Sequence, residues 1–124
     1  NHFSSLIVRQ AIDNGSLGEH IKMLRRVYRS RLEAMDEALH EHFDGIAQWT
    51  RPRGGYFFWL RFEDSVETEP LRQTARENET GFQAGSVFSR VGAFGNCLRA
   101  SFAHYNEDDI CEGITRLRKL FQST

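Results

Sequence analysis

Arg99 is the residue of this chain whose type and setting point most clearly to chemistry. It lies in a short, mainly apolar run at 97–103 (CLRASFA) that has the length and composition of a buried strand. A guanidinium is planar and offers two parallel N–H groups, so it holds a carboxylate in a fixed orientation. Arg99 could therefore hold a carboxylate, although one arginine in an apolar strand does not establish such a site by itself. The alternative is a structural arginine paired with a nearby acid such as Glu107 or Asp108.

A glycine-containing loop supplies the next candidates for ligand contact. It spans 85–95, and loops of this kind often carry binding residues. Within it, Gly85, Ser86 and Phe88 are predicted to line the mouth of the site. Gly85 could instead serve a backbone turn, and Phe88 could serve the core. Arg90 could reach a second carboxylate or be a solvated loop residue.

The other reactive side chains form no metal-binding pattern. His40 and His42 are two positions apart on a predicted helix, so they point in different directions and cannot share one metal ion. His104 is expected to be a capping or surface residue. Cys97 and Cys111 lack metal-ligand spacing, and we expect both to be buried thiols of a reducing compartment.

Length and composition limit the class of protein. The chain has 124 residues, of which 40% are hydrophobic and 27% charged, as is typical of a single globular domain. Its net charge of −1 argues against a strongly basic surface for nucleic acid. No apolar run approaches the roughly 18 residues of a membrane span, and no secretory leader precedes the first helix. We therefore expect a cytoplasmic protein that contacts neither membrane nor nucleic acid.

Hydrophobic periodicity predicts two helices before any strand. Apolar residues recur at helical spacing over 3–14, and Gly15 ends that run. A second helix begins near 16–19 and continues for about six turns, until Asp44 and Gly45 end it. Its first half is rich in arginine. That face could bind a nucleic acid or a partner protein, although a solvated outer face is the simpler interpretation.

Beyond Gly45 the spacing becomes that of strands. Runs at 46–49 and 56–62 are predicted to pair as an antiparallel hairpin, because turn-forming residues at 51–55 connect them. In this turn, Gly54 and Gly55 are expected to form the bend and to let the strand pack closely.

The C-terminal part of the chain completes a mixed fold. We predict a polar helix over 69–78, a short strand over 80–83, a last strand over 98–103 and a final helix capped by Asn106. Segregated helices and antiparallel strands predict an α+β fold, a two-layer sandwich in which helices cover a small antiparallel sheet. The side chains expected to be mostly buried are Phe58, Leu60, Leu98, Ile110, Ile114 and Leu117.

Four motifs in order carry a resemblance to a known family: 51–60 (RPRGGYFFWL), 84–88 (AGSVF), 98–102 (LRASF) and 106–117 (NEDDICEGITRL). Together they resemble the small, C-terminal domain of class I/II aminotransferases of the pyridoxal phosphate (PLP) fold-type I group. Ala84 stands where the family pattern has proline. The motifs are most similar to the 2-aminoadipate or aromatic aminotransferase branch, which also supplies a domain of GntR-type (MocR) transcription regulators.

The resemblance implies a division of labour. Residues 1–124 would form a single small domain, with 1–15 as an interdomain helix segment, and Arg99 would hold the α-carboxylate of an amino-acid or 2-oxo-acid substrate. The family binds PLP covalently through a lysine of its large domain. Lys22 and Lys119 are the only lysines here, and neither has the family's Ser-x-x-Lys context. We therefore expect a fragment without catalytic residues, inactive alone, from an enzyme that is a homodimer.

Three hypotheses stay open at this point. The chain is the substrate-clamping domain of a PLP-dependent aminotransferase, the aminotransferase-like domain of a MocR-type regulator, or a free-standing interaction module that uses its basic helix face.

Overall fold

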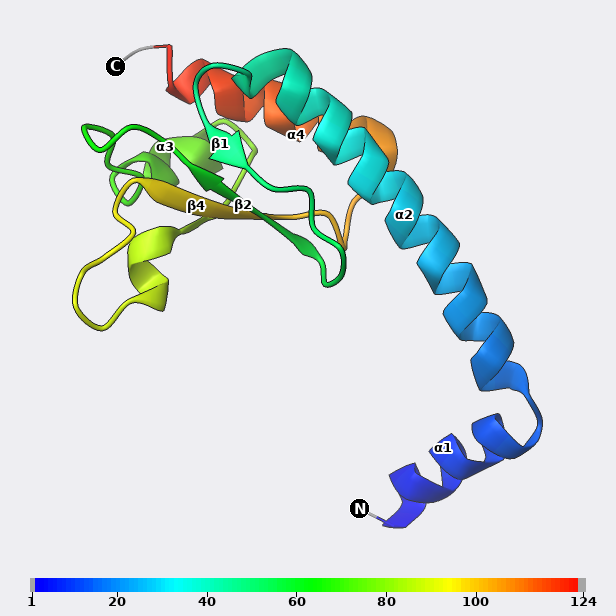
Figure 1. Ribbon diagram of the computed structural model, residues 1–124. Helices are drawn as coiled ribbons and strands as arrows, with labels where there is room; N and C mark the ends of the chain where they lie inside the picture. The colour runs from blue at the N-terminus through cyan, green and yellow to red at the C-terminus, as the bar shows by residue number, and fades with distance from the viewer. Residues whose placement is uncertain (1, 123–124) are drawn as a thin grey trace.

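The computed structural model describes residues 2–122 and shows helices packed on one side of a small sheet (Figure 1). The helices are α1 (His2–Asp13), α2 (Ser16–Phe43), α3 (Leu71–Glu77), α4 (Glu107–Leu120) and the 3-10 helix η1 (Gly85–Phe88). The strands are β1 (Gln48–Trp49), β2 (Phe57–Arg61), β3 (Gln83–Ala84) and β4 (Cys97–Ser101). The predicted α+β two-layer sandwich is confirmed. The short strand expected over 80–83 instead forms at Gln83–Ala84.

The sheet has the order β1-β2-β4-β3, and all three pairings are antiparallel. The predicted hairpin is present, because Trp49 of β1 pairs with Leu60 of β2. β2 and β4 form the long central pair, in which Trp59 lies opposite Arg99. β3 pairs only with the first half of β4, where Gln83 lies opposite Arg99. Arg99 therefore lies on a strand that is hydrogen-bonded on both sides.

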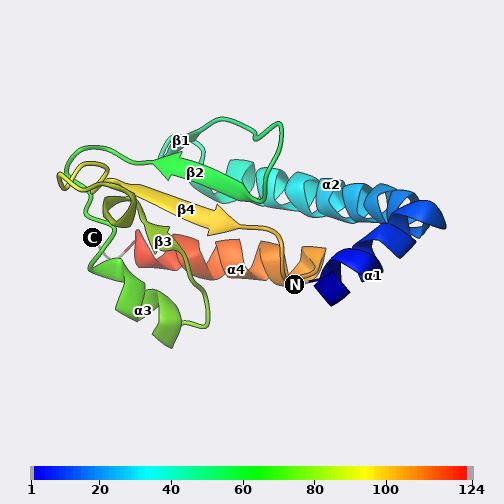
Figure 2. The same ribbon diagram turned by 90° about the horizontal axis from the view of Figure 1, so that it is seen from below.

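α2 and α4 lie side by side across one face of the sheet (Figure 2). Alternation along the strands turns every second side chain toward these helices. The side chains predicted to be buried are all buried, and with residues of α2 they form one core: Met35, Leu39, Phe43, Phe58, Leu60, Leu98, Ile110, Ile114 and Leu117. Burial of a large apolar side chain stabilises a fold by about 1.5–3 kcal/mol. This face therefore holds the domain together.

Local sequence explains where the helices begin. Gly15 adopts a left-handed conformation (φ 76°), which lets the chain turn between α1 and α2. The Asn14 side chain accepts a hydrogen bond from the Ser16 backbone N–H at 3.0 Å and satisfies the start of α2. At the start of α4, the Asn106 side chain accepts a bond from the Asp109 N–H at 2.9 Å, as expected of an N-cap.

The N-terminal part of the chain projects away from the sandwich (Figure 1). α1 has no buried residue, and the buried residues of α2 begin at Met35. The contribution of α2 to the core therefore begins at Tyr28 and Leu32, which are partly buried against it. Within residues 2–122, no helix combines the length and apolar character that a bilayer crossing requires.

Candidate functional site

The face of the sheet opposite α2 and α4 carries the candidate site, and we call it the open face. Because side chains alternate along a strand, the residues between the buried positions of β2 and β4 point to this face. They include Phe57, Trp59 and Arg99. Phe57 is 41% exposed, whereas its neighbour Phe58 is fully buried on the covered face. The open face is not covered by α2 or α4, and η1 packs on part of it, beside β4.

Arg99 is flanked by two aromatic rings on the open face. Its Cζ atom lies 3.9 Å from the ring centroid of Phe57 and 4.4 Å from that of Phe88. Phe57 is the diagonal neighbour of Arg99 across the β2–β4 pair. Phe88 comes from the end of η1, and its ring also contacts the Trp59 ring, with centroids 5.7 Å apart. The guanidinium is therefore held by aromatic contacts.

The guanidinium has no acidic partner within residues 2–122. Its Nε atom is buried and makes no hydrogen bond in that part of the chain. The alternative of a pair with Glu107 or Asp108 is not observed, because Glu107 accepts a hydrogen bond from the Ser30 hydroxyl instead. A buried donor without a partner costs free energy, and an arriving acceptor would remove that cost. The arrangement suits a carboxylate ligand.

The three loop candidates differ in how the structure uses them. Phe88 contacts Arg99, as described above. Gly85 is buried, and a Cβ atom there would lie 2.4 Å from the Phe94 carbonyl oxygen and 2.7 Å from the Cys97 Cβ. Gly85 thus permits the close packing of η1 on β4. The Ser86 hydroxyl lies 3.5 Å from Glu69 Oε2, at the limit of a hydrogen bond, so its observed interaction is with the segment before α3.

Phe57 is a contact of Arg99 that sequence reasoning missed. Phe57 belongs to the run 56–62, which the sequence predicts as one strand of a hairpin. The signal that could have found it is alternation, since Phe57 and Trp59 share a face and Trp59 lies opposite Arg99. The pairing register was needed to use that signal, and it is not visible in one sequence.

The other polar candidates make no hydrogen bond, ion pair or ring contact with Arg99 within residues 2–122. Arg90 is exposed, and no hydrogen bond or ion pair of its side chain occurs within residues 2–122. His40 pairs with Asp44 at 3.0 Å, and His104 contacts the Tyr105 ring. No group of three or more metal-ligating side chains occurs in the part of the chain that the structure describes.

Two expectations from the sequence are wrong. Cys97 is buried as expected, but Cys111 is exposed. Cys111 lies at the margin of the contact between α4 and α2, where its Sγ approaches the Ala34 carbonyl at 3.9 Å, and partial desolvation raises the pKa of its thiol. The expected close packing at Gly54 and Gly55 is also absent, since a Cβ at either position meets open space. Gly55 serves the turn with φ +77°.

The lysines of this chain do not fit a PLP-binding role. Lys22 is exposed on the N-terminal half of α2 and is paired with Glu19 at 2.9 Å. Lys119 is exposed in the last turn of α4. Lys22 lies on the part of α2 that projects away from the sheet, and Lys119 lies on α4, which covers the face opposite Arg99, so neither lysine shares a site with it. We therefore derive no chemical step through PLP on this chain.

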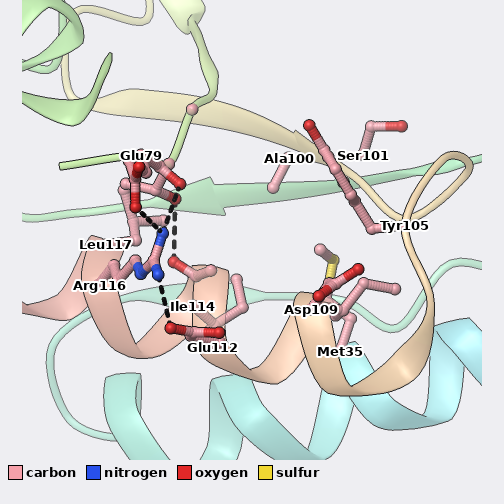
Figure 3. Close-up of a pocket in the computed structure, with 14 residues that line it drawn as sticks. Met35, Glu79, Ala100, Ser101, Tyr105, Asp109, Glu112, Ile114, Arg116 and Leu117 are labelled. Carbon is pink, nitrogen blue, oxygen red and sulfur yellow. Dashed lines mark hydrogen bonds and ion pairs between the residues drawn. The ribbon is translucent and has the colours of Figure 1, made fainter. Parts of the chain in front are cut away.

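A hollow of about 580 Å³ lies on the helix side of the sheet (Figure 3). Its lining includes Ala100 of β4 and Ile114 of α4, and it does not include Arg99. The Arg116 guanidinium on its wall is already paired with Glu79, at 3.0 Å, and with Glu112. This hollow therefore offers no uncompensated guanidinium for a carboxylate.

The antiparallel sheet with two helices on one face is the architecture that the resemblance to aminotransferase small domains implies. Comparison with known proteins confirms that resemblance, although no family model matches the chain. An aromatic-amino-acid aminotransferase of Thermococcus litoralis is 31% identical over 117 residues, which are 94% of this chain and 28% of that protein. The solved α-aminoadipate aminotransferase of Thermus thermophilus, in complex with N-(5'-phosphopyridoxyl)-L-leucine, superposes with a TM-score of 0.85 at 32% identity over 94% of this chain and 30% of that one.

Transcription regulators also resemble the chain. An uncharacterised HTH-type transcriptional regulator of Bacillus subtilis is 29% identical over 117 residues, which are 92% of this chain and 24% of that protein. The chain spans less than a third of the length of each of these three proteins. The similarity therefore concerns one segment that enzymes and regulators have in common.

Proposed function

We propose that the chain is the substrate-clamping small domain of a PLP-dependent aminotransferase. In this proposal the complete protein transfers an amino group from an amino acid to a 2-oxo acid. PLP is held by a large domain outside residues 1–124, and the protein is a cytoplasmic homodimer. The support for the reaction is the similarity to aminotransferases over more than nine-tenths of the chain. The cofactor's placement, the compartment and the dimer are implied by the resemblance alone.

One observation carries the role of the open face. Arg99 has a buried Nε atom without a partner, its guanidinium contacts two aromatic rings, and no acid within residues 2–122 neutralises it. A substrate carboxylate would supply both the missing acceptor and the missing negative charge. A bidentate pair would also fix the orientation of the substrate's Cα–H bond relative to the rest of the site. Arg99 therefore binds and orients the substrate, and we assign it no proton transfer.

Substitution of Arg99 in the complete protein tests this role. We expect Arg99→Ala to lower kcat/KM by about 30- to 4000-fold, which corresponds to the loss of roughly 2–5 kcal/mol from a charge-assisted contact in a closed site. Arg99→Lys keeps the charge without the fork and should lie between alanine and wild type. PLP should remain bound in both variants, as its absorbance will report. A kcat/KM within about threefold of wild type for every amino acid tested would make Arg99 a structural residue.

The similarity to HTH-type regulators supports a second candidate function, that of an effector domain in a MocR-type regulator. The coding sequence upstream of this segment separates the two. A Ser-x-x-Lys motif without a winged helix supports the enzyme, whereas a winged helix ahead of the aminotransferase-like part supports the regulator. The third hypothesis, a free-standing module, gains no support from the comparisons.

A further inference from the structure

The two rings that contact Arg99 come from different elements of the fold. Phe57 belongs to β2, and Phe88 ends η1. Both ring centroids lie within 4.4 Å of the Arg99 Cζ, yet no ring contact joins the two phenylalanines within residues 2–122. The guanidinium therefore contacts two rings that do not pack on each other. The backbone of Arg99 is also held in place, because β4 pairs with both β2 and β3 at this residue.

We propose that Phe57 and Phe88 are positioning residues, which fix the plane of the Arg99 guanidinium so that its fork is aligned for a carboxylate before the ligand arrives. The inference rests on the proposed function, since it takes Arg99 as the carboxylate-binding group. The neighbouring Trp59 does not itself stack on the guanidinium, but its ring supports Phe88 from the sheet side at 5.7 Å.

The physical argument concerns order in the free protein. An arginine side chain has many rotamers, and fixing it only when the ligand binds lowers the affinity. Aromatic faces attract a guanidinium electrostatically and by stacking, and they accept it without supplying a competing hydrogen bond. Two rings therefore hold Arg99 in place and leave its N–H groups free of acidic partners. A carboxylate of this chain in the same place would hold it equally well but would block the ligand.

The test replaces a ring by an aliphatic side chain of similar reach. In the complete protein, Phe88→Leu should weaken the binding of 3-phenylpropionate, a carboxylate without an amino group, by about three- to thirtyfold in Kd measured by titration calorimetry. Phe88→Tyr keeps the aromatic face and should restore Kd to within about twofold of wild type. In an Arg99→Ala background, Phe88→Leu should cause no further loss. A purely structural role of Phe88 would not show this dependence on Arg99.

Phe94→Leu is the matched control. Phe94 and Phe88 are each 44% exposed, and both rings contact Trp59 with centroids 5.7 Å apart, but only Phe88 lies against Arg99. Phe94→Leu should leave Kd within about twofold of wild type. An equal loss in the two variants, or no loss in Phe88→Leu, would overturn the positioning role. If Phe88→Leu does not fold, Phe57→Leu replaces it in the same comparison.

The two proposals fail in different ways. If Arg99→Ala binds 3-phenylpropionate as tightly as wild type does, the carboxylate site itself is wrong. If Arg99→Ala loses binding while both Phe88→Leu and Phe57→Leu retain it, only the positioning role is wrong.

Discussion

The two faces of the sheet are built from neighbouring residues of the same strands, yet they differ in what their side chains contact. On the covered face, Phe58 and Leu98 are fully buried under α2 and α4. On the open face, Phe57 is half-exposed and contacts a cation. A single alternating strand thus supplies a core residue at one position and a site residue at the next. Stability should be concentrated on one face and ligand binding on the other.

The largest expected effect is a difference in the loss of stability between substitutions on the two faces. Phe58→Ala should lower the free energy of unfolding by about 3–5 kcal/mol, because it leaves a cavity in the core. Phe57→Ala removes a half-exposed ring and one cation–π contact, so its loss should stay below about 1.5 kcal/mol. Urea unfolding of both variants measures the difference. Equal losses would show that the open face contributes to the core as much as the covered face does.

A smaller effect tests how tightly the open face is assembled. Gly85→Ala places a methyl group within 2.4–2.7 Å of the Phe94 carbonyl oxygen and the Cys97 Cβ, and such overpacking costs about 1–3 kcal/mol. We also expect weaker carboxylate binding, since η1 must shift and carries Phe88. Gly54→Ala is the control, because its Cβ meets open space and its φ is not positive. If the two variants are equally stable, η1 has room to move and does not fix Phe88.

The covered face was largely predictable from the sequence, because it follows from periodicity. The stripe Ile110, Ile114 and Leu117 has helical spacing, and burial of one helix face is the physical reason for that spacing. The Asn106 cap was predictable because it is a local interaction. Its side-chain oxygen accepts a hydrogen bond from the backbone N–H of Asp109, three residues further along the chain. Local rules suffice where each residue's partner is near in sequence or is simply the core.

The open face was predictable only in part. Arg99 and Phe88 could be singled out by type and motif, but the contact of Arg99 with Phe57 depends on strand register, and that with Phe88 depends on the path of η1. The predicted burial of Cys111 was wrong for a related reason. It follows the buried Ile110 on α4, and the packing of α4 against α2 leaves it exposed at the margin of their contact. Contacts between segments far apart in the chain are what a single sequence does not reveal.

The smallest predicted effect concerns the contact between α2 and α4, the two helices of the covered face. Glu107 begins α4, and the Ser30 hydroxyl of α2 donates a hydrogen bond to its carboxylate. That bond, followed by the backbone at Glu107 and the positive charge of Arg31, lowers the pKa of Glu107. A carboxyl whose pKa is lower in the folded state stabilises the fold above its unfolded pKa, and the stabilisation is lost as the pH falls through the folded value. Wild type should therefore be more stable than Glu107→Gln at pH 7, and the two should converge in acid. Urea unfolding at pH 7 and in acid measures this difference.

Asp108→Asn is the control. It removes a carboxylate from the same first turn without breaking the bond to Ser30, so the loss of stability at pH 7 should be smaller than in Glu107→Gln. If the free energy of unfolding of Glu107→Gln differs from that of wild type by the same amount at both pH values, the charge of Glu107 does not contribute to the contact between α2 and α4.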